Sequence, residues 1–250
     1  MQYHEIGKTG MKVSSLSFGA SSLGGVFHDL KEKEGIQAVF TAIEAGMNFI
    51  DVSPYYGHYK AETVLGKALK DIPRDRYYLS TKVGRYGKDG VNMWDYSAKR
   101  ATESVYESME RLNIDFIDLI NVHDVEFADL NQVVNETLPA LVELREKGVV
   151  GHVGITDLQL ENLKWVIDHS PSGTIESVLS FCHYCLFKLL IFCNLYFVLG
   201  CAFNSLQCKT YFLSIFLFNC FFNNCLSNIY RLFFCSLTWL FFSRCLCICI

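Results

Sequence analysis

The sequence predicts an α/β fold: an incomplete (β/α)8 TIM barrel that contains strands 1–6, followed by a hydrophobic, cysteine-rich C-terminal tail. Three observations support this prediction. Six short apolar runs alternate with helical patterns along the first 184 residues. The centres of these runs lie roughly 27–40 residues apart, which is the length of one strand–helix unit. No GxGxxG turn follows the first run, and this favours a barrel over a Rossmann sheet.

The expected elements follow one another in chain order. Residues 2–14 are expected to form a short hairpin with residues 8–10 as its turn. The six expected strands are 16–20, 48–52, 77–83, 116–123, 149–156 and 177–183. Ser97 can cap the N-terminus of the third helix, and Gly46 and Gly148 stand where the first and fourth helices should end.

Five helices are expected between the strands, because apolar residues recur there at helical spacing. In chain order, their predicted inner faces are Ile36, Val39, Phe40 and Ile43; Val64, Leu65, Ala68 and Leu69; Ala101, Val105, Met109 and Leu112; Val134, Leu138 and Leu141; and Leu160, Leu163 and Ile167. Regular alternation of strands and helices indicates a parallel sheet covered by helices.

The chain changes character near residue 185. All eleven cysteines lie at or after Cys182, no acidic residue follows Glu176, and no proline follows Pro171. We therefore expect residues 1–184 to form a truncated α/β domain and residues 185–250 to be an aberrant tail. Translated non-coding sequence is the preferred explanation of the tail, because it lacks the acids, prolines and helical period of a folded segment. A membrane anchor and a genuine core segment are the two alternatives.

Charge and cysteine content limit the classes of partner and the compartment. Four of the 22 Lys and Arg residues lie in the tail, which leaves 18 against 26 Asp and Glu in the rest of the chain. An acidic domain does not suggest a nucleic-acid partner. The polar N-terminus shows no secretory signal, so we expect a cytoplasmic protein with reduced thiols and no stable membrane association.

No metal site is expected from the cysteine pattern. Cys182 and Cys185 lack a second pair at zinc-finger spacing, and Cys245, Cys247 and Cys249 alternate within an apolar run. The cysteine pattern therefore gives no reason to expect a metal cofactor.

Four polar residues stand at or just beyond the C-terminal ends of the expected strands. Asp51 ends the second strand, Tyr56 follows in its loop, Lys82 ends the third strand and His123 ends the fourth. Because the C-terminal strand ends of a barrel build one mouth, these four side chains should converge there. Each alone has an ordinary structural explanation, such as a hydrogen bond between His123 and Asp124. The combination is what predicts a catalytic site.

The same segments resemble those that carry the Asp/Tyr/Lys/His tetrad of the aldo-keto reductases. They read DVSPYYG at 51–57, STK at 80–82 and NVH at 121–123, in the family's order and spacing. The resemblance covers about residues 2–184 and is closest to the plant-type L-galactose dehydrogenases. Segments that carry this closer resemblance include 5–10, 123–127, 136–141 and 180–184.

The resemblance implies an NAD(P)-dependent oxidoreductase that acts on a small sugar or carbonyl substrate. Tyr56 would be the general acid or base, and the Lys82 ammonium would lower the pKa of that tyrosine. Asp51 would orient Lys82, and His123 would hold the substrate oxygen or assist the proton relay. The preferred reaction is oxidation of L-galactose to its lactone in ascorbate biosynthesis.

The resemblance also implies cofactor contacts. Gly19, Ala20 and Ser21 would lie near the nicotinamide, and Thr156, Asp157 and Ser180 would hold its carboxamide. Asp157 departs from the family's usual Asn or Gly, so its role stays open. The family binds the pyrophosphate and adenosine after strands 7 and 8, which the sequence does not show. NAD is therefore the implied cofactor, and NADP stays open.

Other functions compete with this prediction. The chain could belong to an aldo-keto reductase that reduces small aldehydes, to a cofactor-binding regulatory subunit on the same barrel, or to a membrane-anchored variant. The sequence does not predict an oligomeric state. A barrel truncated after its sixth strand is expected to fold poorly and to be weakly active or inactive.

Overall fold

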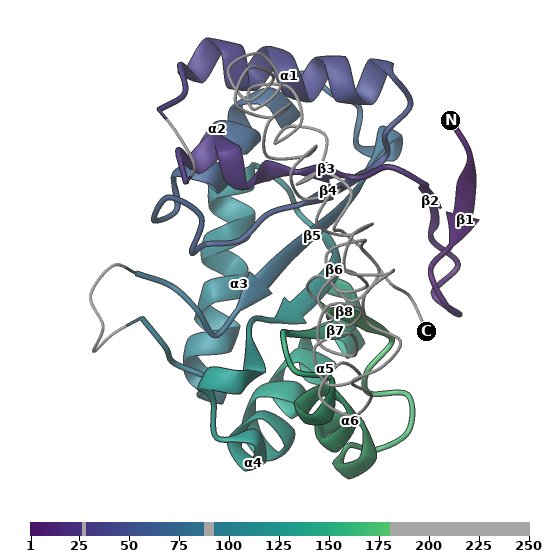
Figure 1. Cartoon of the computed structure of the whole chain (residues 1–250), viewed down its shortest axis with the longest axis vertical. Helices are drawn as coiled ribbons and strands as arrows, with labels where there is room; N and C mark the ends of the chain where they lie inside the picture. The colour runs from purple at the N-terminus through teal and green to yellow at the C-terminus, as the bar shows by residue number, and fades with distance from the viewer. Residues whose placement is uncertain (27–28, 88–92, 181–250) are drawn as a thin grey trace, which may run out of the picture. The chain divides into compact units, whose positions relative to one another are not determined.

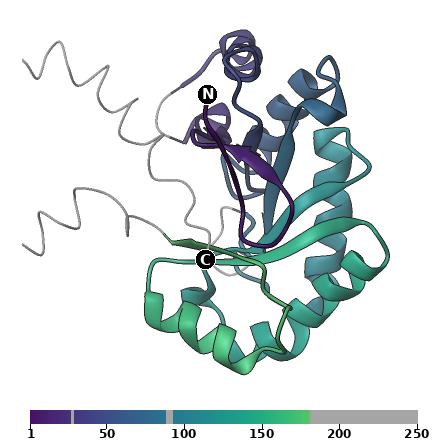
Figure 2. The same ribbon diagram turned by 90° about the vertical axis from the view of Figure 1, so that its right-hand side faces the viewer.

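The computed structural model describes residues 1–26, 29–87 and 93–180. These residues form a curled sheet of six parallel strands in the order β3-β4-β5-β6-β7-β8, with helices along its outer side (Figures 1 and 2). The strands are β3 Phe18–Gly19, β4 Phe49–Asp51, β5 Tyr78–Val83, β6 Ile117–Val122, β7 Val150–Asp157 and β8 Ser177–Ser180. The predicted α/β class with six strands of a barrel is confirmed. The predicted tail, 185–250, and the end of the predicted sixth strand, 181–183, lie outside the described residues.

The helices connect the strands as predicted. They are η1 Ala20–Gly24, α1 Glu32–Glu44, α2 Lys60–Leu69, η2 Arg74–Arg76, α3 Ala98–Leu112, η3 Val125–Phe127, α4 Leu130–Gln132, η4 Val133–Thr137, α5 Leu138–Glu146 and α6 Leu160–His169. Ser97 caps α3, since its hydroxyl accepts a hydrogen bond from the Arg100 N–H at 3.3 Å. Gly46 and Gly148 follow α1 and α5 with φ of 91° and 72°, conformations that glycine adopts without strain.

The predicted hairpin consists of β1 Tyr3–Glu5 and β2 Lys12–Ser14, paired antiparallel. Its apolar residues Ile6, Met11 and Val13 pack with Phe49 and Leu119 of the sheet in one buried cluster. The Asn48 side chain, just before β4, accepts from the Ser14 N–H at 2.7 Å and donates to the Lys12 carbonyl at 2.9 Å. The hairpin thus seals the N-terminal end of β4, opposite the end where the predicted site lies.

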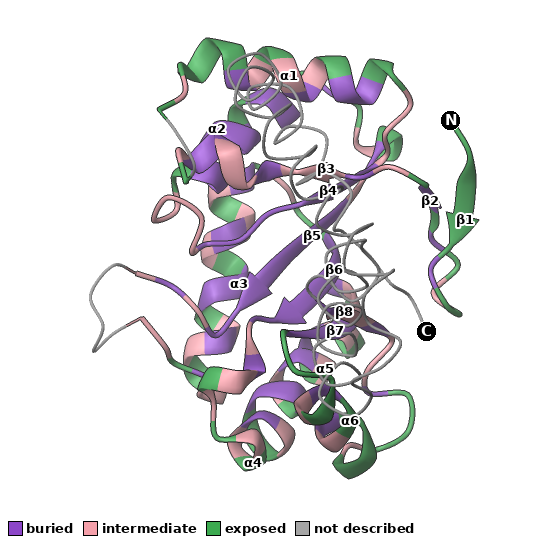
Figure 3. Ribbon diagram, viewed as in Figure 1, coloured by how far each residue is buried: buried purple, intermediate pink, exposed green. Residues whose placement is uncertain are grey.

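The interior of the sheet is almost entirely buried (Figure 3). Five of the six residues of β5 and all six of β6 are buried, as expected for a parallel sheet covered on its outer face. Helices α2 and α3 contact each other closely beside β5. Glu62 of α2, fully buried, accepts hydrogen bonds from Thr81 of β5 and from Arg111 of α3, each at 2.7 Å.

Two predicted helix faces are wrong in detail. In the fourth, Leu138 and Leu141 are buried as predicted and Val134 is partly buried against the core, but the buried valine of the π-helical turn η4 is Val133. In the fifth, Leu163 is buried as predicted, but Val166 rather than Ile167 is its buried partner, and Leu160 and Ile167 are 46% and 42% exposed. The buried stripe of this ten-residue helix is thus narrower than the predicted one.

Candidate active site

The structure brings the four predicted catalytic residues together at the C-terminal ends of β4, β5 and β6. Asp51 is the last residue of β4, Lys82 is the penultimate residue of β5, and His123 directly follows β6. Tyr56 lies in the loop after β4, with its ring centre 5.0 Å from the Lys82 Nζ and 5.9 Å from the His123 ring centre. We refer to these four residues as the tetrad.

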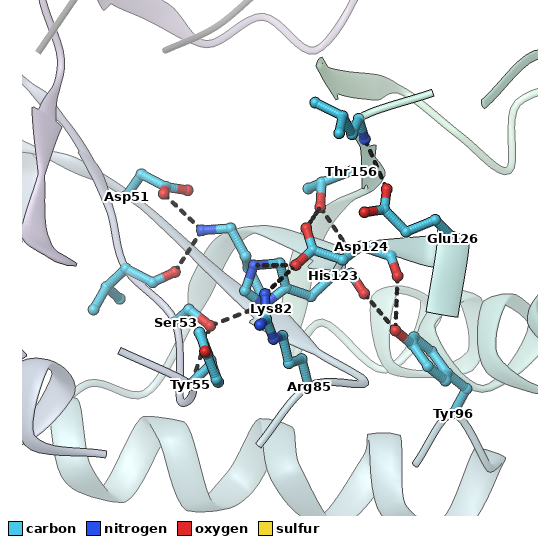
Figure 4. A network of polar contacts seen from close by, with 12 residues as sticks. Asp51, Ser53, Tyr55, Lys82, Arg85, Tyr96, His123, Asp124, Glu126 and Thr156 are labelled. Atoms are coloured by element: carbon cyan, nitrogen blue, oxygen red, sulfur yellow. Dashed lines mark hydrogen bonds and ion pairs between the residues drawn. The ribbon is translucent and has the colours of Figure 1, made fainter. Parts of the chain in front are cut away.

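Lys82 is held as a buried, charged group (Figure 4). Its Nζ donates hydrogen bonds to Asp51 Oδ2 at 2.6 Å and to the Val52 carbonyl at 2.8 Å. Only 2% of the lysine side chain and 4% of the aspartate side chain are exposed. Burial alone would lower the pKa of Lys82, but the charge of Asp51 and its hydrogen bond to the ammonium raise it above its ordinary value. The ammonium therefore stays protonated throughout the physiological pH range.

Asp51 is itself oriented by two further side chains. The Ser80 hydroxyl donates to Asp51 Oδ1 at 3.1 Å, and the Asn121 amide donates to that hydroxyl at 3.0 Å. Both carboxylate oxygens of Asp51 thus have partners, as a buried charge requires. Sequence reasoning found Asp51 and Lys82 but not this supporting chain. The sequence feature that could have indicated this chain is the pair of polar residues, Ser80 and Asn121, within otherwise apolar strands.

The loop that carries Tyr56 is packed tightly against η1. A Cβ at Gly57 would lie 2.1 Å from the Gly24 carbonyl oxygen, so only glycine fits there. Gly57, His58 and Tyr59 all have positive φ, of 61°, 53° and 69°. Such a run of left-handed residues is costly and persists only where the surrounding structure imposes it. The segment that begins with Ala20 and Ser21 is thereby held against the Tyr56 loop.

The predicted effect of Lys82 on Tyr56 is outweighed by another one. Burial of the phenol is the largest influence and raises the pKa of Tyr56; Lys82 lowers it, and Asp51 raises it again. The net result is a pKa above the ordinary value of 10, whereas the sequence argument predicted a lowered one. The reason is that the sequence shows the ammonium but not the depth at which the hydroxyl is buried. Tyr56 is therefore protonated near neutral pH.

His123 lies opposite Tyr56 as a neutral ring. Its Nδ1 is 3.1 Å from the Ser53 hydroxyl, and its Nε2 is 3.6 Å from Asp124 Oδ2. Burial, and then the positive charges of Lys82 and Arg85, lower the pKa of His123 well below its ordinary value. The ring therefore has one N–H and one lone pair at neutral pH, and it can donate or accept a hydrogen bond.

A charged and aromatic group that the sequence argument missed borders His123. Arg85 donates to Asp124 Oδ2 at 2.6 Å, and its guanidinium lies 3.6 Å from the ring centre of Tyr55 and 4.5 Å from that of Trp94. Asp124 has a φ of 48° and its N–H donates to the Thr156 hydroxyl at 2.9 Å. The available signal was the charge at two successive strand ends, Arg85 and Asp124.

The residues predicted to contact the cofactor lie at the same end of the sheet. Gly19 ends β3, beside Asp51 in register, and Ser180 ends β8, beside Asp157. Asp157 already has protein partners, because its oxygens accept from the Gln159 N–H at 2.6 Å and from the Asn162 amide at 3.0 Å. It holds the start of α6, which gives it a structural role that its sequence position did not reveal.

The described residues provide neither a metal site nor a membrane-spanning helix. No group of three or more His, Cys, Asp or Glu side chains in residues 1–26, 29–87 and 93–180 could hold a metal ion. None of the helices within those ranges is long and apolar enough to cross a membrane. All eleven cysteines of the chain lie outside these ranges.

Comparison with known proteins finds relatives with the same architecture. The sequence profile of the Aldo/keto reductase family matches residues 15–191. The chain is 45% identical over 186 residues to L-galactose dehydrogenase from Arabidopsis thaliana, covering 74% of this chain and 57% of that protein. It is 35% identical over 181 residues to D-arabinose 1-dehydrogenase from Saccharomyces cerevisiae, covering 68% and 52%.

Among solved structures, aldo-keto reductase AKR11C1 from Bacillus halodurans (holo form) matches with a TM-score of 0.63 and 30% identity, over 72% of this chain and 57% of that one. The chain thus spans about half the length of the curated relatives it matches. The family profile covers well over half of the chain, and the parallel sheet of residues 18–180 has the fold of that family's solved members. On these grounds the chain belongs to the aldo/keto reductase family.

Proposed function

We propose that this chain carries the catalytic site of an NAD(P)-dependent oxidoreductase that converts L-galactose to its lactone. The observation that carries the proposal is the position of the buried Lys82 ammonium between Asp51 and Tyr56, with neutral His123 on the other side of the tyrosine. Similarity to L-galactose dehydrogenase and D-arabinose 1-dehydrogenase supports an aldose as the substrate. NAD as the cofactor, a cytoplasmic location and a role in ascorbate synthesis are carried over from the same similarity.

Each member of the tetrad has one task in this proposal. Tyr56 takes the hydroxyl proton when the alcohol is oxidised and returns it when a carbonyl is reduced. Lys82 favours the phenolate by its charge, and Asp51 keeps that charge in place. His123 directs a ring nitrogen at the substrate oxygen. A bound nicotinamide would accept or supply the hydride at its C4.

The residues present fit the carboxamide end of such a cofactor. Asn121 Oδ1 is buried and has no hydrogen-bond partner within the described part of the chain. Asn121 pairs in register with Lys82 and with Gly154, so this acceptor lies in the same layer as the tetrad lysine. A carboxamide N–H is the type of donor that a buried amide oxygen needs. We propose that Gly19, Ala20, Ser21, Thr156 and Ser180 contact the same end of the cofactor. In this proposal residues 1–184 are the catalytic domain and residues 185–250 are a separate tail.

The test is an assay of the purified full chain with L-galactose and either NAD or NADP, which follows the reduced nicotinamide by its absorbance. We expect weak turnover with NAD that disappears in Tyr56→Phe. An enzyme that reduces simple aldehydes with NADPH, but leaves L-galactose unchanged, would refute the substrate. Binding of either cofactor without any turnover would refute the catalytic role.

Reduction of small aldehydes is the second candidate, and one observation favours it. The raised pKa of Tyr56 keeps the hydroxyl protonated at neutral pH, which is the form that donates a proton to a carbonyl oxygen. The ratio of kcat/KM for L-galactose oxidation to kcat/KM for aldehyde reduction, measured at one pH on one preparation, separates the two candidates. A ratio that favours the aldehyde even at alkaline pH would select the second.

A further inference from the structure

Ser53 is a buried residue of the site to which the sequence argument gave no role. It follows β4 by two positions, its exposed fraction is 0%, and its hydroxyl oxygen lies 3.1 Å from His123 Nδ1 (Figure 4). The same oxygen accepts a hydrogen bond from the Tyr55 N–H at 3.2 Å. These two contacts determine the direction of the bond between serine and histidine.

A hydroxyl has one proton to donate and two lone pairs to accept with. The Tyr55 N–H uses a lone pair of Ser53, and within the described residues His123 Nδ1 is the one acceptor within reach of its proton. If Nδ1 carried the ring proton, the serine proton would be buried without a partner, which is unfavourable. The serine therefore donates to Nδ1.

The other side of the ring leads to the same tautomer. Asp124 Oδ2 lies 3.6 Å from Nε2, and a carboxylate oxygen attracts an N–H and repels a lone pair. Lys82 and Arg85, which face the ring from β5 and the loop after it, oppose a second proton. The His123 ring thus carries a single proton, on Nε2.

We propose that Ser53 is a positioning residue that fixes His123 as its Nε2–H tautomer, so that this nitrogen donates a hydrogen bond to the substrate oxygen. The inference rests on the proposed function for the identity of the acceptor, but not for the tautomer. Without Ser53, either ring nitrogen could carry the proton. In the wrong tautomer a lone pair on Nε2 would face both Asp124 and the substrate oxygen.

Hydrogen bonds hold the backbone of His123 in place, so the position of the ring proton is the main property that can still change. The His123 N–H donates to the Val83 carbonyl at 2.8 Å, and the Tyr96 hydroxyl donates to the His123 carbonyl at 2.8 Å. Because these bonds hold the main chain on both sides, loss of the Ser53 hydroxyl should change the protonation of the ring more than its position.

The direct test is nitrogen-15 NMR of the histidine rings in the full chain, which needs neither substrate nor cofactor. His123→Gln identifies the His123 signals among those of seven histidines. At neutral pH we expect a lone-pair-type shift for Nδ1 and a protonated-type shift for Nε2 in the unmodified protein and in Ser53→Thr. Ser53→Ala should show a mixture of tautomers. Ser104→Ala, which removes an equally buried hydroxyl from α3, should leave the His123 signals unchanged.

Kinetics then test the consequence separately. Ser53→Ala should lower kcat by about 10-fold, the usual weight of one lost hydrogen bond. Ser53→Thr, which keeps the hydroxyl, should retain the kcat of the unmodified protein. Cofactor affinity should not change in either variant. A protonated Nδ1 in the unmodified protein, or unchanged His123 signals in Ser53→Ala, would overturn the proposal. If the tautomer is as expected but no aldose is oxidised, the proposed function fails and the assignment of the tautomer stands.

Discussion

Three titratable side chains within a few ångströms of one another are held in different protonation states in this protein. Lys82 is charged because Asp51 is its hydrogen-bonded partner. His123 is neutral because it is buried beside positive charge, and Tyr56 is neutral because its burial outweighs the effect of the Lys82 charge. Groups whose environments keep them in different protonation states can play different parts in one proton transfer. The arrangement therefore supports tyrosine as the proton donor or acceptor and lysine as a permanent cation.

The first residue-scale prediction concerns Tyr56. Tyr56→Phe should reduce turnover by at least about 100-fold, the contribution of a positioned acid or base. Nicotinamide affinity, measured by fluorescence titration, should change little because the ring stays in place. Tyr106→Phe serves as the matched control, since Tyr106 is 49% exposed on α3. Turnover of Tyr56→Phe within threefold of the parent would remove Tyr56 from the proton transfer.

The direction of the Tyr56 shift also predicts a pH dependence. Oxidation needs the phenolate, and a raised pKa means that this form increases only in the alkaline range. The value of kcat/KM for alcohol oxidation should thus rise with pH up to at least about pH 9, below the ordinary tyrosine pKa of about 10. Rates in a series of buffers at constant ionic strength provide the measurement. A plateau reached below pH 7 would mean that the base is another group.

His123 should make the folded protein sensitive to acid. Its folded-state pKa is lowered, so below the ordinary value of 6.5 the unfolded chain binds a proton that the folded chain does not. Stability from this residue is therefore present above pH 6.5 and is lost progressively as the pH falls below it, at a rate of at most about 1.4 kcal/mol per pH unit. Urea unfolding from pH 7 to 5.5 should show this loss, and His123→Gln should lack it. An equal loss in both proteins would assign it to other groups.

At the scale of elements, the close contact of α2 with α3 depends on one glycine. A Cβ at Gly66 would lie 2.1 Å from the Arg111 carbonyl oxygen, which belongs to rigid helix backbone. Gly66→Ala should force the helices apart and weaken the buried pair of Glu62 with Arg111, at a cost of about 1–3 kcal/mol or more.

Gly35 of α1 is the matched control for Gly66. A Cβ there would come closest to the ends of the Leu23 and Leu30 side chains, at 2.9 and 3.0 Å, and these can move. Helix propensity favours alanine by about 1 kcal/mol in both positions. Gly35→Ala should therefore change the free energy of unfolding by less than about 1 kcal/mol. If chemical denaturation shows equal effects of the two substitutions, the α2–α3 contact is not the cause.

The elements also show which features a sequence can predict. Strands β3–β8 and the cap at Ser97 were predictable because apolar runs and capping residues act locally. The π-helical turn Val133–Thr137 was not, because it depends on how the helix packs on the sheet. The convergence of the tetrad was predictable too, because it follows from the barrel topology. The raised pKa of Tyr56 was not, because it depends on burial. Nor was the contact of Ser53 with His123, because these residues lie 70 positions apart in the chain.

At the scale of the whole molecule, the described part of the chain divides its tasks between the two ends of one sheet. The C-terminal strand ends carry buried charges and left-handed backbone, as at Lys82 and His58, both of which cost stability. The N-terminal ends carry the apolar cluster of the hairpin with Phe49 and Leu119. Stability and chemistry should therefore be separable by mutation.

Ile6 provides the test of this separation. It is 1% exposed at the turn of the hairpin, where it packs into the cluster with Phe49 and Leu119. Ile6→Ala should lower the free energy of unfolding by about 2–4 kcal/mol, because it removes buried methyl groups and leaves a cavity. Ile6→Val, which removes one methyl group, should cost only about 0.5–1.5 kcal/mol.

In both variants kcat/KM per folded molecule should stay within about twofold of the parent, since no bond of the tetrad changes. Tyr56→Phe should show the opposite pattern: lost turnover with nearly unchanged stability. Denaturation curves and initial rates on the same preparations decide the matter, and a large loss of kcat/KM in Ile6→Ala at a temperature where the protein remains folded would show that the two ends are coupled.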